Sequence, residues 1–303
     1  WYAYLEVDSP TAWFNNQTYV DTLNPAAMQR FIEVTHERYR EAVGDSFGTD
    51  VPAIFTDEPQ FTHKRSLHFS DSREDAIFPW TPDLEEAFTR EHGESMLAHF
   101  PEVIWDLPGG KASRWRYRYH EWIAERFAAS FADQIGSWCE AHHIALTGHM
   151  MEEPTLSSQT NALGDAMRSY RAMQIPGIDM LCDWNEFNTA KQAQSAARQF
   201  GCPGVLSELY GVTGWHFDFK GHKRQGDWHA ALGVLFRVHH LSWYCMRGEA
   251  KRDDPASISY QSPWYKEDPI IEDHFARLGA VLSRGKAVCR VAVIHPVESY
   301  WLC

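Results

Sequence analysis

The chain has 303 residues, with 28 lysines and arginines against 41 aspartates and glutamates, which gives a formal net charge of −13 at pH 7. This acidic balance argues against a nucleic-acid partner, because affinity for the phosphate backbone rests on Lys and Arg. Hydrophobic residues make up 44%, as in globular rather than disordered proteins, and no apolar run approaches the roughly 20 residues that span a bilayer. We therefore expect a soluble globular protein with no nucleic-acid and no membrane partner.

Short apolar runs alternate with amphipathic stretches along the chain. The clearest helix lies between the first two predicted strands. Asn24 is a good N-cap for it, Pro25 suits its first turn, and Gly44 follows its last apolar residue. A long helix is predicted from Trp115 to Trp138, where apolar residues recur at helical spacing. The six predicted strands are Tyr2–Val7, Val51–Thr56, Ile144–His149, Gly177–Cys182, Pro203–Ser207 and Leu241–Met246, and further helices are predicted over residues 161–173, 189–200, 227–240 and 269–283.

Strands that alternate with helices, each long enough for a crossover, favour an α/β fold with a parallel sheet covered by helices. Six strands are too few for a closed (β/α)8 TIM barrel, but they fit an incomplete barrel whose first two βα units are missing. The segment from Gln60 to Ser113 interrupts the alternation and is interpreted as a long insertion after the second strand.

The two ends of the chain predict a piece of a longer protein. Trp1 enters a strand-like run at once, and Cys289–Ile294 has the pattern of a new strand close to the last residue. We therefore assign residues 1–288 to a partial barrel and residues 289–303 to the start of a following β-rich domain. Further domains of the same longer chain are the expected partners.

The six cysteines are scattered, with no C-x-x-C pair and no spacing typical of a zinc site. Several stand in apolar runs, such as Cys182 and Cys245, where the sequence favours a buried free thiol over a disulfide. Free thiols are typical of reducing compartments, so the cysteines lean toward a cytoplasmic location.

Acidic side chains follow nearly every predicted strand. In a (β/α)8 barrel the active site is built at the carboxyl ends of the strands, by the loops that follow them. The second strand delivers Asp57 and Glu58, and Pro59 then ends its ladder. The later strands are followed by His149 with Glu152 and Glu153, by Asp183 with Trp184, by Glu208 with Tyr210, and by Arg247 with Glu249. This repetition predicts a polar site at one end of the barrel.

Glu58 and Glu208 are the candidates for catalysis. Hydrolysis of a glycosidic bond needs one carboxyl group that gives a proton to the leaving oxygen, and a second that acts as nucleophile or as base for water. Two acids that project from different strand ends into one cavity can have their pKa values pushed apart, which separates these roles. We predict Glu58 as general acid and Glu208 as nucleophile or general base of a glycosidase. For either glutamate alone, the alternative is a helix cap or an ion pair with arginine.

Aromatic residues make up 14% of the chain, and several follow the same strand ends, where their rings could stack on the C–H faces of a sugar. Trp184, Trp215 and Trp264 lie in polar, loop-like settings and are predicted to form the walls of a carbohydrate site together with Tyr210. The residues predicted to bind sugar hydroxyls are Asp57, His149, Glu152 and Asp183. A metal site formed by the same four residues is an alternative, although adjacent acids are a weak signal for a metal site.

Three short runs carry a family resemblance. Leu23-Asn24-Pro25 at the start of a helix, Phe55–Pro59, and the later Ala256–Trp264 resemble the large glycoside hydrolases related to the α-L-rhamnosidases of family 106. The resemblance covers most of the chain. It implies a (β/α)8 catalytic domain followed by β-rich domains, an inverting mechanism and an association with calcium.

The chain also resembles the wider barrel clan whose acid/base glutamate follows strand four and whose nucleophile follows strand seven. Counting Val51–Thr56 as strand four makes Pro203–Ser207 strand seven, so Glu58 and Glu208 match those places. That clan usually carries Asn before the acid/base, whereas this chain has Asp57. A second acid so close could raise the pKa of Glu58 or could bind a cation.

Two other functions remain open from the sequence. A non-catalytic carbohydrate-binding barrel would use the same acids only to hold hydroxyls. A metal-dependent hydrolase of another bond type would use them as ligands. A glycosidase of the predicted type requires no cofactor, and a calcium ion enters only through the resemblance.

Overall fold

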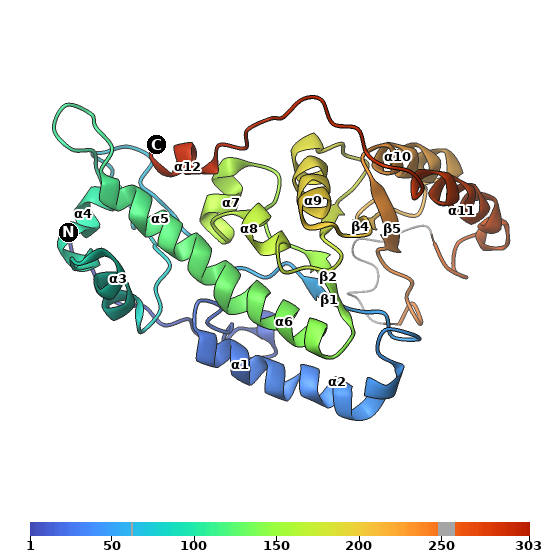
Figure 1. The fold of residues 1–303 in the computed structure, drawn as a ribbon, viewed down its shortest axis with the longest axis horizontal. Coiled ribbons are helices and arrows are strands. Elements are labelled where there is room, and N and C mark those ends of the chain that lie inside the picture. Colours follow the sequence, from blue (N-terminus) through green and yellow to red (C-terminus); the bar gives the residue numbers. More distant parts are fainter. Residues whose placement is uncertain (62, 248–257) are drawn as a thin grey trace.

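The computed structural model describes residues 1–61, 63–247 and 258–303, and it has an α/β fold in which helices surround short parallel strands (Figure 1). The strands are β1 (Ala53–Asp57), β2 (Ala145–His149), β3 (Gly177–Met180), β4 (Val205–Leu209) and β5 (Val234–His239). The helices are α1 (Pro25–Val34), α2 (His36–Val43), α3 (Leu84–His92), α4 (Met96–Ile104), α5 (Arg114–Phe127), α6 (Gln134–Ala141), α7 (Leu156–Ala162), α8 (Ala166–Tyr170), α9 (Phe187–Phe200), α10 (Phe219–Ala231), α11 (Pro269–Leu282) and α12 (Val297–Trp301).

The strands form two parallel sheets that succeed one another in chain order. β1 pairs with β2, and β3, β4 and β5 form the second sheet. The two sheets meet at β2 and β3, where the Ile175 N–H just before β3 donates to the Leu146 carbonyl of β2 at 3.2 Å. The carboxyl ends of all these strands therefore lie at the same edge, as the sequence predicts for a parallel arrangement.

Glycine at two positions allows the strands to approach closely. Gly148 in β2 has φ +119°, and a Cβ atom there would lie 1.9 Å from the Thr56 carbonyl oxygen of β1. A Cβ atom on Gly177 in β3 would lie 2.1 Å from the carbonyl oxygen of Gly148. Only a residue without a side chain fits at either place.

The first two helices predicted from the sequence are present, the first of them as two successive helices, α1 and α2. The Asn24 side-chain oxygen accepts hydrogen bonds from the N–H groups of Ala26 (3.0 Å) and Ala27 (3.3 Å), which caps α1. The predicted long helix is a continuous rod made of α5, a π-helical segment over residues 128–133, and α6 (Figure 1). Its apolar stripe is buried, and it contributes much of the hydrophobic core.

Two predicted strands are wrong. Tyr2–Val7 forms no strand, and its apolar side chains are exposed, with Tyr2 at 98%. An apolar extended segment becomes a strand only where a neighbour supplies a ladder, and none of the described residues does so here. The predicted strand Leu241–Met246 is also absent, and the last strand is instead β5, inside the range predicted as a helix.

That second error has a local cause. The helix α10 begins earlier than predicted, because the Asp218 side chain accepts from the Gly221 N–H at 2.9 Å and caps it. It ends at Ala231, and Gly233 with φ +93° turns the chain into β5. A short apolar run such as Val234–His239 fits either period, so periodicity alone could not separate strand from helix.

Smaller differences concern the remaining segments. The predicted helix over residues 161–173 is two short helices, α7 and α8, separated at Gly164 with φ +86°. Cys289–Ile294 forms no strand and runs exposed across the molecule toward α12 (Figure 1). The insertion after the second predicted strand contains α3 and α4. Part of the resemblance motif, Ala256–Ser257, lies outside the described residues, as does Glu249.

None of the six cysteines, all of which lie in the described ranges, forms a disulfide, as predicted, although Cys182 and Cys245 are half-buried rather than buried. Within the described ranges, no helix combines the length and the apolar character needed to cross a membrane.

Candidate active site

Four titratable side chains gather on one face of the strands, toward their carboxyl ends. The register places Asp57 of β1 opposite His149 of β2, and Asp179 of β3 opposite Glu208 of β4. Residues opposite each other in parallel strands project to the same side of a sheet, and alternate residues project to the other side. Together with Glu58, which follows β1, these residues are here called the acidic cluster.

His149 is the centre of the acidic cluster and is only 1% exposed. Its Nε2 atom lies 3.0 Å from Asp57 Oδ1 and 3.9 Å from Asp179 Oδ2, and its Nδ1 atom lies 3.8 Å from Glu208 Oε2. Among the described residues, neither ring nitrogen has a partner in hydrogen-bond alignment. Burial by itself would lower the pKa of His149, but Asp57 and the surrounding carboxylates raise that pKa to about 9. The imidazole is therefore a positive charge enclosed by acids.

Glu58 reaches the acidic cluster through an unusual backbone conformation. Its φ of +47° lies in the left-handed region, which residues with a side chain rarely adopt. One carboxylate oxygen each from Glu58 and Asp179 and one ring nitrogen of His149 all lie within 4.8 Å of one another. The same holds for the corresponding atoms of Asp57, His149 and Glu208. The positive φ of Glu58 is a strained conformation. Backbone strain of this kind persists where the surrounding structure enforces it, and it is typical of functional sites.

The carboxyl groups of the acidic cluster differ in their pKa values. Burial raises the pKa of Glu58 and of Glu208 above the ordinary value for glutamate. Burial also raises the pKa of Asp179, to about 6, whereas the His149 imidazole lowers the pKa of Asp57. The site therefore combines three carboxyl groups whose pKa is raised with one whose pKa is lowered, as is typical of sites for acid–base chemistry.

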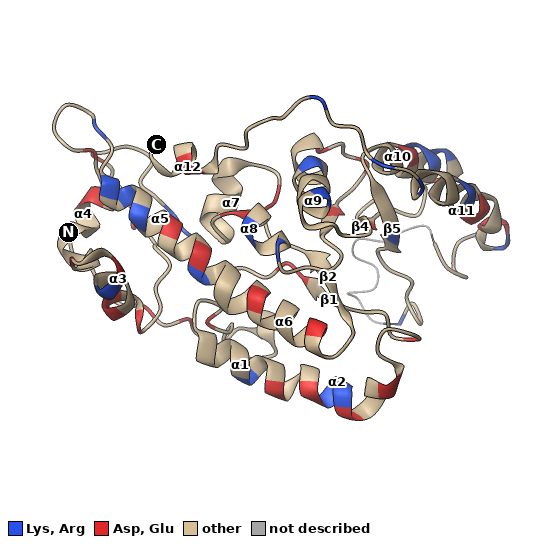
Figure 2. Cartoon of the chain, viewed as in Figure 1, with Lys and Arg blue, Asp and Glu red and all other residues tan. Residues whose placement is uncertain are grey.

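Within the described ranges, arginine and lysine do not pair with the acids of the cluster. On helices α2 and α5, acidic and basic residues are interspersed (Figure 2), and Arg40 of α2, for example, binds Glu37 at 2.6 Å. Within the described part of the chain, neither Glu58 nor Glu208 forms an ion pair with arginine or lysine, and the ion-pair partners of Glu208 are His149 and His240. The alternative of an arginine clasp is therefore not what the structure has.

Glu153 lies behind the acidic cluster and is 3% exposed. Its Oε1 atom accepts from the Tyr170 hydroxyl at 2.6 Å and from the Met150 N–H at 3.0 Å, and its Oε2 atom accepts from the Asp179 N–H at 3.3 Å. Burial raises the pKa of Glu153 to about 7. Its neighbour Glu152, which the sequence singles out as a sugar ligand, is exposed, with φ +58°.

The other predicted site residues lie outside the acidic cluster. Tyr210 is fully buried and donates its hydroxyl to the His222 carbonyl at 3.2 Å, so the structure does not present it to a ligand. Asp183 forms an ion pair with Arg224. Of the predicted walls, Trp184 is exposed, Trp215 is half-buried against Trp243, and Trp264 is half-buried against Phe219. The structure thus brings Asp57, Glu58, His149 and Glu208 together and leaves the rest on surrounding loops or in the core.

Sequence reasoning missed two members of this region. Asp179 stands inside β3 rather than after it, and the signal was a single acid within an otherwise apolar strand. His240 follows β5, and its Nε2 atom lies 3.9 Å from Glu208 Oε1. It was missed because the last strand was placed too late in the chain.

Two sets of three side chains each offer ligand atoms that could hold a metal ion. One set is Asp57, His149 and Glu208, and the other is Glu58, His149 and Asp179. The ring nitrogens of His149 are buried and have no aligned hydrogen-bond partner among the described residues, which suits a metal ligand. The histidine nitrogen suits zinc or another transition metal better than calcium, which prefers six to eight oxygen ligands.

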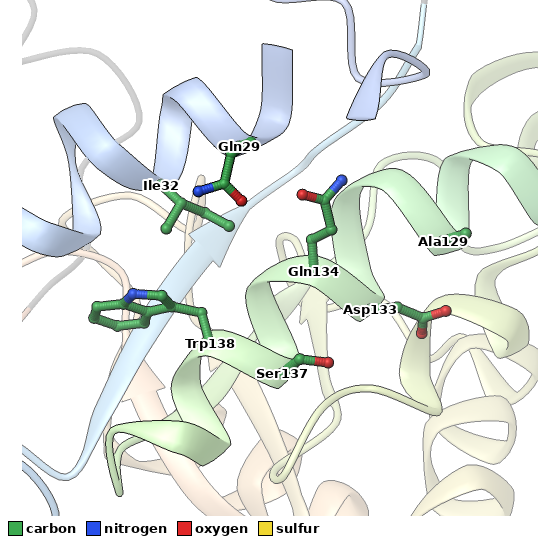
Figure 3. A pocket seen from close by; sticks show the side chains of 7 residues that line it. All are labelled: Gln29, Ile32, Ala129, Asp133, Gln134, Ser137 and Trp138. Carbon is green, nitrogen blue, oxygen red and sulfur yellow. The ribbon is translucent and has the colours of Figure 1, made fainter. Parts of the chain in front are cut away.

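One hollow elsewhere on the molecule offers less chemistry. Figure 3 shows a cavity of about 430 Å³ between α1 and the rod of α5 and α6, lined by Gln29, Asp133 and Trp138 among others. Its one acid, Asp133, is bound by Arg171 at 2.6 Å. The acidic cluster is therefore the better candidate for an active site.

Parallel strands in chain order, helices around them and acids at the strand ends define an α/β fold with a polar site at the carboxyl ends of its strands. No protein-family model and no curated protein matches the chain.

Solved structures do resemble the chain. One is a rhamnosidase from Novosphingobium sp. PP1Y, with a TM-score of 0.64 and 20% identity over 89% of this chain and 25% of that one. Another is a GH42 β-galactosidase from G. stearothermophilus, with a TM-score of 0.55 and 10% identity over 93% of this chain and 44% of that one. The chain therefore spans less than half the length of either protein. Similarity at such identities shows a shared fold.

Proposed function

We propose that this chain is part of the catalytic domain of a glycoside hydrolase, with Glu58 as general acid and Glu208 as nucleophile or general base. The observation that carries the proposal is that both carboxyl groups border the same buried imidazole, His149, without an arginine or lysine partner among the described residues. Two carboxyl groups at one site are what hydrolysis of a glycosidic bond needs.

The electrostatics act in the same direction on both glutamates, because burial raises the pKa of each and the His149 imidazolium opposes that rise. A general acid must carry a proton at the working pH, and burial favours the protonated form of Glu58. The second carboxyl group must be ionised, and the His149 imidazolium, whose Nδ1 lies 3.8 Å from Glu208 Oε2, favours the charged form of Glu208 against the effect of burial. Asp57, held ionised beside Nε2, keeps the imidazole protonated.

The substrate is a carbohydrate in this proposal, and the remaining predicted residues would surround it. Asp57, His149, Glu152 and Asp183 would take hydroxyl groups, with Trp184, Trp215 and Trp264 as walls. Membership of the rhamnosidase-type family 106 is part of the same proposal, as is an incomplete (β/α)8 barrel over residues 1–288 with a further domain that begins at residue 289. The rhamnosidase similarity supports it.

A screen of chromogenic glycosides with the purified chain tests the proposal. Glu58→Gln should lower kcat on the best substrate by about 10²–10⁴-fold, because the amide cannot donate a proton to the leaving oxygen. The Glu58→Gln variant should still bind the uncleaved sugar, as measured by calorimetry. If the wild-type chain binds sugars and cleaves none, the non-catalytic carbohydrate-binding barrel is correct instead.

The stereochemistry of the product separates the two forms of the mechanism. Carboxyl groups about 5–5.5 Å apart give retention, and groups about 6.5–9.5 Å apart leave room for water and give inversion. NMR of the first-formed anomer reports this directly. Inversion, which the family resemblance implies, would make Glu208 the general base.

A metal-dependent hydrolase is the second candidate, and the two donor sets around His149 favour it. A bound ion there would supply Lewis acidity, with Asp57, His149 and Glu208 or Glu58, His149 and Asp179 as its ligands. Metal analysis of the purified chain, and titration of the chelated chain with zinc, would decide. Stoichiometric zinc together with activity lost on chelation and no glycosidase activity would favour this candidate.

A further inference from the structure

The acidic cluster is divided between the two sheets. Asp57, Glu58 and His149 belong to β1 and β2, whereas Asp179 and Glu208 belong to β3 and β4. The separation of the two proposed catalytic carboxyl groups is therefore set across the seam where β2 meets β3, and no regular ladder joins these two strands.

Different groups bridge the two ends of this seam. At the amino end, the Ile175 N–H donates to the Leu146 carbonyl at 3.2 Å, and the Leu146 N–H donates to Gln174 Oε1 at 2.7 Å. At the carboxyl end, beside the acidic cluster, the bridge is a side chain. The carboxylate of Glu153 accepts from the N–H of Met150, the residue after His149, and from the N–H of Asp179.

Glu153 is itself held firmly at both its side chain and its backbone. The Tyr170 hydroxyl donates to its carboxylate at 2.6 Å. Its carbonyl oxygen accepts from Gln159 Nε2 at 2.6 Å and from Gln192 Nε2 at 3.1 Å. Since the residue is 3% exposed, water cannot readily replace these bonds.

We propose that Glu153 is a positioning residue that fixes the two halves of the acidic cluster against each other, and so sets the separation of Glu58 and Glu208. The inference rests on the proposed function for its kinetic consequence. A displacement of about 1 Å in a catalytic constellation can cost about 10²-fold in rate, so the bridge matters for turnover as well as for stability.

Glutamine is the substitution that opens this bridge with the least change of shape. Both oxygens of the Glu153 carboxylate act as acceptors, one toward Met150 and the other toward Asp179. An amide has one acceptor oxygen, and its NH₂ group would face one of the two backbone N–H donors. E153Q therefore loses one side of the bridge and sets two donors against each other.

Kinetics on the best glycoside test the proposal. E153Q should lower kcat about 100-fold and change KM by less than about threefold, since the sugar contacts remain while the catalytic groups shift. Q174M is the matched control, because it removes a bond at the other end of the same seam. It should lower thermal stability comparably and leave kcat within about threefold of the wild type.

Amide hydrogen exchange tests the bridge without any need for activity. In E153Q, exchange at Met150 and Asp179 should accelerate at least about tenfold, while exchange at Ile175, at the far end of the seam, stays as in the wild type. Should E153Q fail to fold, E153D, whose shorter side chain can reach only one of the two N–H groups, gives the same pattern with a smaller change.

Each outcome decides the matter. The proposal is overturned if E153Q leaves amide exchange at Met150 and Asp179 unchanged. It is also overturned if Q174M and E153Q lose kcat equally. Accelerated exchange in a chain whose wild type cleaves no glycoside would retain the bridge and reject the proposed function.

Discussion

The two faces of β3 and β4 differ sharply although they share a backbone. Glu208 projects into the acidic cluster, whereas the next residue, Leu209, is fully buried in the hydrophobic core. Asp179 and Met180 repeat the contrast on β3. Because successive side chains of a strand point to opposite faces, one short strand can serve chemistry on one side and stability on the other.

The face that carries the acids is also the less covered one. Phe55 of β1 and Phe236 and Val238 of β5 are all more than a third exposed, although they lie within strands. The register places Phe236 opposite Leu206, and Val238 opposite Glu208, on this same face. The opposite face is covered by helices and supplies the core. We therefore expect substitutions on the two faces to affect different measurements.

The largest effect is expected from E208Q. It should lower kcat by about 10³-fold, since a neutral amide cannot act as nucleophile or base, while the free energy of unfolding changes by less than about 1 kcal/mol. Steady-state kinetics and urea denaturation check the two halves of the statement. E272Q on α11, where Glu272 binds Arg237 and His239, is the control and should keep its kcat. A large loss of stability in E208Q would mean that the face with the acids contributes to stability as well.

L209A should show the reverse pattern. Removal of this buried side chain should lower the free energy of unfolding by about 3 kcal/mol, from lost apolar burial and the cavity that remains. F236A, on the more exposed face, should lose only about 1 kcal/mol, since much of its ring is already in contact with solvent. Urea denaturation of both variants measures the difference. Equal losses would mean that both faces contribute equally to the core.

The charge on His149 predicts a pH-dependent stability. Asp57 and the surrounding carboxylates outweigh burial and raise the pKa of His149 to about 9, above the value of about 6.5 expected in the unfolded chain. The stabilisation is therefore complete below pH 6.5 or so and is lost as the pH rises through about 9. We expect the free energy of unfolding to fall by about 3 kcal/mol over that window.

Urea denaturation across this pH range tests the prediction. H149Q should show a flatter dependence between the two pH values, because the imidazole that loses its proton there is absent. H216Q, which alters an exposed histidine after β4, should follow the wild type. A wild-type chain whose stability rises with pH over this window would contradict the assignment of a positive charge to His149.

The smallest effect is expected from Y210F. Its hydroxyl donates to the His222 carbonyl in the core, so its loss should cost about 1 kcal/mol of unfolding free energy. KM for the best glycoside should not change, because the ring does not face the acidic cluster. A rise in KM of more than about threefold would restore Tyr210 to the substrate site that the sequence predicted for it.

Much of the site could be read from the sequence because it depends on local signals. Asp57 and Glu58 follow an apolar run that ends in Pro59, and Glu208 stands in a similar run, so their places at strand ends were predicted directly. The cap at Asn24 was equally local. His240 could not be found in this way, because its strand, β5, has a pattern that fits both a helix and a strand.

The adjacent residues Glu152 and Glu153 show what only the tertiary structure decided. By itself the sequence determined most of the helices, most of the strands and the order in which acids follow them, since period and capping are properties of neighbouring residues. It could not determine that Glu152 is exposed while Glu153 is buried and spans the seam. That depends on Tyr170 and on Asp179, distant in the chain, which supply donors only once β2 and β3 lie side by side.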